Sequence, residues 1–257
     1  MKRDERLLYG LLWSILGALV VTGFAVQGFP GTVEGLWRIQ VHPGRLLNDF
    51  TSVAGEGAAL VNAALAAAIG LALVKVNRVR LSGPTVAAFF TILGFGLFGK
   101  TPTNILPIIL GVWLSAKIVR KRFAEYILIA LFGTALGPLV TMLAFELGAA
   151  PALAIPLAVA GGVLAGMLLP PLALVMLRLH QGYNLYNIGL TSGFLGLAVA
   201  AIVTASAGNH AQGVALAAQL AGVPATIARA SSTTNRWRPS GPRAASEAPS
   251  TVSAYRW

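Results

Sequence analysis

Cysteine is absent from this sequence, and charged residues are scarce: Asp, Glu, Lys and Arg together make up 11% of its 257 residues. The lack of cysteine excludes disulfide bonds and thiolate metal sites. Soluble domains carry about a quarter charged residues, because a solvated surface has to be covered. The charges present here are too few to cover a globule, so lipid is the expected solvent for most of the surface.

Acidic residues are the scarcer of the two signs, which leaves a formal net charge of +11. The basic residues do not form one patch for a nucleic acid. They stand in short clusters between long uncharged runs, as expected for loops retained on the cytoplasmic side of a membrane. We therefore expect a lipid bilayer and no nucleic acid as partner, with these clusters in the cytoplasm: Lys2, Arg3 and Arg6; Lys75, Arg78 and Arg80; Lys117, Arg120, Lys121 and Arg122.

Long apolar runs make up much of the sequence, since 56% of the residues are hydrophobic. A helix needs about 20 apolar residues to cross the hydrocarbon. Four prolines predict that the run at 147–177 is a broken or kinked span. The opening "MKRDER" has mixed charge and no small-residue cleavage site, so we expect a retained first span with a cytoplasmic N-terminus rather than a signal peptide. Five full spans are predicted: 7–28, 57–74, 126–145, 147–177 and 187–205.

Two shorter apolar segments, 84–99 and 104–116, have basic clusters on both outer sides. The chain is expected to enter and return there, either as two thin spans or as a re-entrant hairpin. Their tip, "GFGLFGKTPTN", is rich in helix breakers, which favours the re-entrant form, although non-helical backbone at membrane depth must be covered by protein or water. The predicted fold class is all-α: a polytopic membrane helix bundle of about five full spans plus this helical hairpin.

Two stretches resemble each other at a constant offset of 125: "GAALVNAAL" (57–65) and "GYNLYNIGL" (182–190). Internal repeats of this kind are common in transporters, with sites near the midplane at discontinuous helices. The repeat predicts a first membrane half at 1–122 and a truncated second half at 123–204. A second hairpin is expected near 208–241, where the sequence does not contain one.

Several phrases together resemble the DUF1576 family: "HPGRLLNDFTSVAGEGAALVNAAL", "GFGLFGKTPTNILPIILGVWL", "LFGTALGPLVTML" and "HQGYNLYNIGLTSGFLG". The resemblance covers roughly residues 8–203. It implies a bacterial multi-pass membrane protein built from two related halves, which we expect in the inner membrane. It supplies no substrate and no catalytic residues.

The phrase "ASAGNHAQGVALAAQLAGVPATI" (205–227) is similar to threonine dehydratase, a pyridoxal-phosphate enzyme. The resemblance implies that Asn209 would contact the pyridoxal ring. The Schiff-base lysine that such an enzyme needs is missing upstream, so we expect no cofactor and no enzyme activity. The residues at 228–257 are typical of a disordered tail or a shifted reading frame. One hypothesis is a membrane protein joined to a dehydratase fragment; the alternative is a natural half-length protein with a chance match.

Lys100 is the leading candidate for a solute site, together with Thr103 and Asn104 at the hairpin tip. A lysine at membrane depth costs about 2.5–3.5 kcal/mol on insertion scales, so such residues tend to be functional. If the hairpin is re-entrant, Lys100 would meet an anionic solute or a neighbouring carboxylate. If both segments span fully, it lies in an aqueous loop.

Four further polar residues are weaker candidates. Asn62 and Asn187 lie in or at the head of apolar helices, where an amide binds solute or simply bonds a neighbouring helix. Asp49 and Glu56 bracket the second span, as outer-loop charges or as ligands for a cation or proton. The histidines have no metal-ligand spacing, so no metal site is expected. The pattern "GGVLAG" (161–166) predicts close helix packing.

The sequence therefore predicts a non-enzymatic membrane protein, with a small-solute transporter or channel as the first hypothesis and homo-oligomers allowed. A membrane scaffold and a pyridoxal-phosphate dehydratase fragment are the alternatives. Solute uptake in proteoliposomes separates the transporter from the scaffold. Absorbance near ~410 nm after addition of the cofactor would identify the dehydratase.

Overall fold

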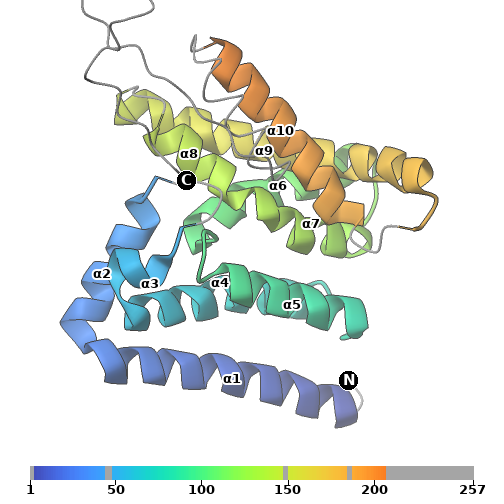
Figure 1. The fold of residues 1–257 in the computed structure, drawn as a ribbon. Coiled ribbons are helices and arrows are strands. Elements are labelled where there is room, and N and C mark those ends of the chain that lie inside the picture. The colour runs from blue at the N-terminus through green and yellow to red at the C-terminus, as the bar shows by residue number, and fades with distance from the viewer. Residues whose placement is uncertain (1–2, 44–47, 147–149, 184–186, 207–257) are drawn as a thin grey trace, which may run out of the picture. The chain divides into compact units, whose positions relative to one another are not determined.

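The structure, a computed structural model, describes residues 3–43, 48–146, 150–183 and 187–206, with the last seven as backbone only. Every element within these ranges is an α-helix or a short 3₁₀-helix and none is a strand, which confirms the all-α prediction (Figure 1). The chain divides into two compact units, Met1–Gly196 and Leu197–Trp257. The dehydratase-like stretch beyond residue 206, with Asn209, and the predicted tail lie outside the described residues and stay predictions. The predicted division into two membrane halves, 1–122 and 123–204, also stays a prediction.

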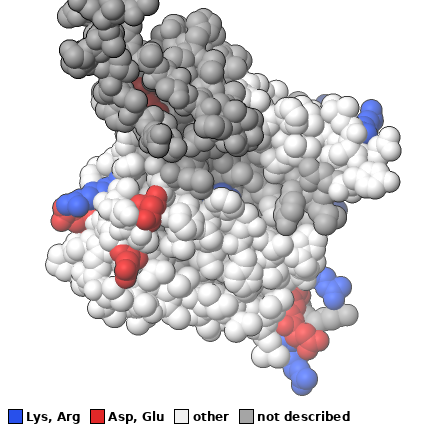
Figure 2. All heavy atoms as spheres, in the orientation of Figure 1, with Lys and Arg blue, Asp and Glu red and all other residues white. Residues whose placement is uncertain are grey.

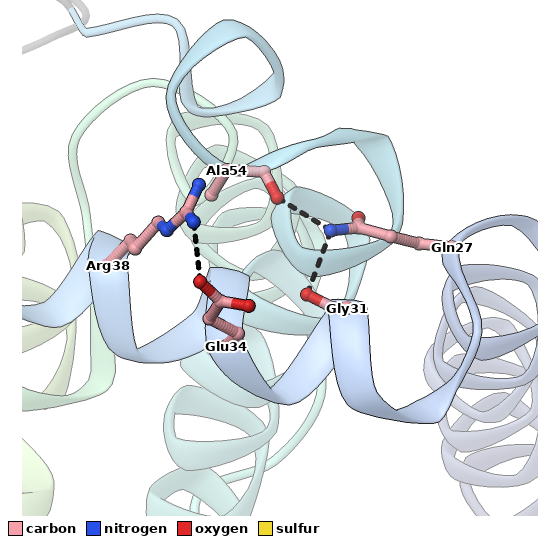
Figure 3. Close-up of polar contacts among 5 residues, drawn as sticks. All are labelled: Gln27, Gly31, Glu34, Arg38 and Ala54. Carbon is pink, nitrogen blue, oxygen red and sulfur yellow. Dashed lines mark hydrogen bonds and ion pairs between the residues drawn. The ribbon is translucent and has the colours of Figure 1, made fainter.

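Helix α1 (Arg3–Gln27) contains the first predicted span and runs beside α4 (Figure 1). It ends at Gly28, whose φ of 73° lies in the left-handed region, and α2 (Phe29–Val41) then starts with a proline in its first turn. The Gln27 side chain holds this corner: its amide nitrogen donates to the carbonyls of Gly31 and Ala54, at 2.9 and 2.7 Å (Figure 3). The Arg38–Glu34 ion pair lies on the exposed side of α2 (Figure 3).

Helix α4 (Glu56–Val76), preceded by the short α3 (Phe50–Ala54), is the central helix of this part of the molecule. It packs against α1, α2 and α5. Most of its buried residues are alanine or glycine, and such small side chains let neighbouring helices approach closely. A Cβ at Gly57 would overlap the carbonyl oxygen of Gly23 in α1, so these two helices touch backbone to backbone.

The two short segments of the predicted hairpin form α5 (Gly83–Phe95) and α6 (Pro102–Ile118), which pack mainly on other helices, α5 on α4 and α7, and α6 on α9 and α8. At 1.5 Å per residue these helices reach only about 20 and 25 Å. The Arg78/Arg80 cluster precedes α5, and the Arg120–Arg122 cluster follows α6. The tip at Gly96–Thr101 therefore lies at the end of the hairpin away from both basic clusters.

The position of the helix break differs from the prediction. The segment expected to be the broken one is a single continuous helix, α9 (Pro151–His180), with three prolines inside it. The predicted span at 126–145 lies within one helical segment, Phe123–Phe145. Its α-helical hydrogen bonding breaks at 3₁₀ turns, so the segment consists of η1 (Phe123–Tyr126), α7 (Ile127–Gly133), η2 (Thr134–Leu136) and α8 (Gly137–Phe145).

Pro138 explains the break. It has no N–H to donate to the carbonyl of Thr134, and that carbonyl accepts from Gly137 in a tighter 3₁₀ turn instead. The Thr134 hydroxyl then donates to the carbonyl of Leu131, at 2.6 Å. The predicted break at 147–177 is therefore absent, whereas a kink in that run stays a prediction; the number of prolines in a run says less than their local hydrogen-bond partners.

Glycines let α6 pack against α9. A Cβ at Gly111 would overlap the carbonyl oxygen of Val163 and lie 2.8 Å from the Cα of Gly166, and one at Gly162 would lie 2.8 Å from the Cβ of Pro107. The close packing predicted for "GGVLAG" is thus confirmed. The remaining helix, α10 (Asn187–Ser206), coincides with the last predicted span.

Four helical segments within the described residues are long and apolar enough to cross a membrane: Arg3–Gln27, Glu56–Val76, Phe123–Phe145 and Pro151–His180. Many large apolar side chains on them are exposed, including Leu11, Val21 and Leu164. On the face shown in Figure 2, charged side chains gather at the edges and leave a broad uncharged area between them. A surface of this kind is suited to lipid rather than water, and the protein is an integral membrane protein.

Candidate functional site

Lys100 is buried, with 2% of its surface exposed, and does not lie in an open loop. Its ammonium donates to the hydroxyl of Thr134, at 2.9 Å, and lies 5.3 Å from the centre of the Phe95 ring. The hairpin tip therefore meets the break between α7 and α8. Two discontinuities that are far apart in the sequence come together around one positive charge.

Two glycines let the tip fold into this position. A Cβ at Gly96 would lie 2.5 Å from the Cα of Ala63, so the tip touches α4 directly. Gly99 has a φ of 148°, which glycine adopts without strain, and a Cβ there would lie 3.3 Å from Pro138. The tip is thus wedged between α4 and the first turn of α8.

The N-terminus of α6 is closed by its own side chains. The Thr101 hydroxyl accepts from the backbone N–H of Asn104, at 3.1 Å, and the Asn104 side-chain oxygen accepts from the N–H of Thr101, at 2.9 Å. The Asn104 amide also donates to the carbonyl of Gly99, at 2.8 Å. Reciprocal capping of this kind satisfies two of the N–H groups that a helix start leaves free. Asn104 is therefore committed to the shape of the tip.

Asn62 fastens the tip to α4. It is fully buried, and its amide nitrogen donates to the carbonyls of Gly96 and Lys100, at 2.7 and 2.8 Å. Its oxygen accepts from the side-chain amide of Gln40 in α2, at 3.1 Å. The prediction placed Asn62 and Lys100 separately, and the structure brings them together through the Lys100 backbone.

A hydrogen-bonded chain leads from this point to the surface. The hydroxyl of Thr103, which is exposed, donates to the Gln40 oxygen, at 2.8 Å, and lies 3.0 Å from the Thr101 hydroxyl. Gln40 thus links exposed Thr103 to buried Asn62. Sequence reasoning missed both Gln40 and Thr134. A polar side chain in the apolar run "LWRIQV" and a threonine four residues before Pro138 are the signals that could have found them.

The Lys100 ammonium is only partly compensated. A lysine at the centre of a spanning helix costs about 2.5–3.5 kcal/mol, and a desolvated cation–π contact of the kind made with Phe95 offsets about 0.5–2 kcal/mol. An ammonium has three N–H donors, of which one has its acceptor in Thr134. Within the described part of the chain, no carboxylate pairs with Lys100, and the other two donors have no acceptor.

The remaining candidates lie elsewhere. Asp49 is exposed and caps α3, where hydrogen bonds from the Ser52 and Thr51 side chains lower the pKa of its carboxyl to about 2. Glu56 is exposed in the first turn of α4. The described residues include no group of three His, Cys, Asp or Glu side chains placed to hold a metal ion.

Asp49 and the tip are connected through the backbone rather than through the carboxylate. The N–H groups of Asn48 and Phe50 donate to the carbonyls of Phe98 and Leu97, each at 3.1 Å. The segment that Asp49 caps therefore lies against the tip, while its carboxylate bonds only within α3.

Asn187 has a different environment from Asn62. Its oxygen accepts from the Nε2 of His180, at 2.8 Å, and its amide donates to the carbonyl of Ala173, at 3.1 Å. It is half-buried, and these bonds tie the start of α10 to α9. The two asparagines that the repeat relates by sequence thus have unlike partners.

A family model described as "Protein of unknown function (DUF1576)" matches residues 30–205. The match covers more than half of the chain, so the chain belongs to this family. The matched range includes the hairpin, the broken helix, Gln40 and Asn62, and it ends where the dehydratase-like phrase begins. No curated protein and no solved structure matches the chain.

Proposed function

We propose that this member of the DUF1576 family is a non-enzymatic, multi-pass protein of the bacterial inner membrane that transports or conducts a small solute, with its N-terminus in the cytoplasm. The observation that carries the proposal is the meeting of the hairpin tip and the α7–α8 break at buried Lys100. Solute sites of transporters are commonly built from discontinuous helices, whose interrupted backbone faces the substrate.

The depth of the tip supports this proposal. Asn62, which binds the tip, lies six residues after Glu56 and fourteen before Val76. These separations correspond to about 9 and 21 Å along α4. If α4 crosses the membrane, the tip is inside the hydrocarbon rather than at its edge, as in a re-entrant hairpin. Non-helical backbone is tolerated there when protein covers it, as α4 and α8 do.

The chain Thr103–Gln40–Asn62 supports a route between the site and the outer side. It consists of side-chain amides and hydroxyls, which exchange hydrogen bonds with water or solute at little cost. It starts at an exposed threonine and stops at the backbone of Lys100. In the structure these bonds close the tip against α2 and α4, as expected for an occluded conformation.

Uptake by proteoliposomes containing the purified full chain tests the proposal. We expect uptake of at least one class of labelled solute, whether cationic, neutral or anionic, above that of empty liposomes, and at least a tenfold loss in Lys100→Met. Lys117→Met is the matched control, because Lys117 also lies over an aromatic ring, 5.4 Å from the centre of Trp113, but is exposed. Absence of uptake for every class would overturn the proposal in favour of the scaffold.

A further inference from the structure

We infer that the site at the hairpin tip takes a small monovalent anion, a monocarboxylate or an inorganic anion of similar size, held by the ammonium of Lys100. This inference rests on the proposed function and specifies its substrate class. Lys100 is the one charged side chain among the described residues that is buried, with 2% of its surface exposed.

The charge at the site decides between classes of solute. A cation would meet a buried ammonium at short range in a medium of low dielectric constant, where like charges repel strongly. The two described acidic side chains nearest to Lys100 in sequence, Glu125 and Glu56, are exposed and do not pair with Lys100. A neutral solute would leave the charge as it is, whereas an anion neutralises it.

Hydrogen bonding points in the same direction. The Thr134 hydroxyl gives its proton to the carbonyl of Leu131, so toward Lys100 it acts as an acceptor only. Two ammonium N–H groups remain without acceptors in the described part of the chain. At the α6 N-terminus, the N–H groups of Thr101 and Asn104 are already bonded within the helix cap. A carboxylate or halide supplies the missing acceptors, since charge-assisted bonds of this type are the strong ones.

Thermal unfolding of the purified full chain in detergent tests anion binding without transport. Sodium acetate is compared with acetamide, its neutral isostere, and sodium chloride and sodium phosphate identify the kind of anion. We expect a saturable rise in Tm of about 3–8 °C with acetate or chloride and none with acetamide. A rise with acetate alone assigns a carboxylate, and a rise with chloride or phosphate alone assigns an inorganic anion. Equal Tm values in acetate, chloride, phosphate and acetamide would overturn the inference.

Variants test whether the anion-dependent rise in Tm comes from the site at Lys100. Lys117→Met keeps the anion-dependent rise, Lys100→Met loses it, and Lys100→Arg, which keeps the charge, retains at least part of it. If Lys100→Met fails to fold, Thr134→Val serves instead and is expected to weaken half-saturation several-fold, with Thr141→Val as its control, because the Thr141 hydroxyl only donates to the carbonyl of Pro138. An unchanged rise in Lys100→Met, or in Thr134→Val where that variant replaces it, would overturn the inference.

Uptake measurements separate this inference from the proposed function. Uptake of labelled acetate or chloride that Lys100→Met abolishes supports both. Uptake of neutral or cationic solutes only, with no competition by anions, overturns the anion assignment and leaves the transporter. An anion-dependent, Lys100-dependent Tm rise without uptake of any solute overturns the transporter and leaves the anion site.

Discussion

At the scale of single residues, polar side chains inside the bundle have separate tasks. Asn62 and Asn104 use their amides to hold the tip in shape, whereas Lys100 keeps unused hydrogen-bonding capacity. Gln27 resembles Asn62, because its amide bridges the ends of α1 and α3 and accepts from the N–H of Ala58, at 2.9 Å. A fully used side chain acts in folding, and a partly used one is free to act on a ligand.

Replacement of Asn62 by leucine tests its structural role. Asn62→Leu removes two bonds to buried carbonyls, and each unsatisfied group costs about 1–3 kcal/mol, so we expect a loss of about 2–6 kcal/mol in the free energy of unfolding. The control is Asn77→Leu at the exposed end of α4, where the backbone N–H of Asn77 still bonds Leu73. We expect under about 1 kcal/mol there. Chemical unfolding in detergent measures both, and equal losses would contradict the role assigned to Asn62.

At the scale of elements, glycines allow the close contacts between helices, and a proline that lacks an N–H donor causes the break in helical hydrogen bonding. Helices α6 and α9 approach through Gly111 and Gly166, whose facing surfaces leave no space for a side chain. Between α7 and α8 the α-helical hydrogen bonding gives way to a 3₁₀ turn, where Pro138 withholds a donor from Thr134. The α6–α9 contact thus fixes α6, the second helix of the hairpin. The 3₁₀ turn between α7 and α8 supplies Thr134 as the hydrogen-bond partner of Lys100 at the tip.

Alanine at Gly111 is expected to disturb the α6–α9 contact. The new Cβ would overlap backbone atoms of α9, and forced overpacking costs about 1–3 kcal/mol. Gly94→Ala is the matched control, since a Cβ at Gly94 meets nothing within 4 Å. Alanine is the better helix former by about 1 kcal/mol, so the control should be neutral or stabilising. Thermal unfolding of both variants and of the unsubstituted protein measures the effect. A Gly111→Ala variant as stable as the unsubstituted protein would show that the two helices move apart easily.

At the scale of the whole molecule, the uncharged surface and the basic clusters predict an orientation in the membrane. The two ends of the hairpin, near Ser82 and Arg120, both adjoin basic clusters, and Glu56 starts α4 at the opposite end from Lys75. The positive-inside rule places the basic ends in the cytoplasm. The hairpin then enters and leaves the membrane on the same side.

Single cysteines test this orientation, and the natural absence of cysteine means that no background thiol has to be removed. In intact spheroplasts we expect a membrane-impermeant maleimide to label Glu56→Cys, because that position faces outward. Ser82→Cys and Arg120→Cys should react only after permeabilisation, because both adjoin cytoplasmic clusters. Labelling of Ser82→Cys and Arg120→Cys from opposite sides would mean that the hairpin segment crosses the membrane an odd number of times, which contradicts the predicted orientation.

The sequence by itself determined that lipid surrounds this protein. It also determined where the helical runs and the hairpin lysine lie along the chain, because hydropathy and charge act locally. The place of the break and the partners of Lys100 were decided by the tertiary structure. Four prolines predicted a break or a kink in residues 147–177, yet α9 is continuous and Pro138 interrupts the α-helical hydrogen bonding of the neighbouring segment. Thr134 and Gln40 joined the site only through contacts 34 and 63 residues away along the chain. A local pattern can mark such residues as candidates, but which of them meet depends on how the helices pack.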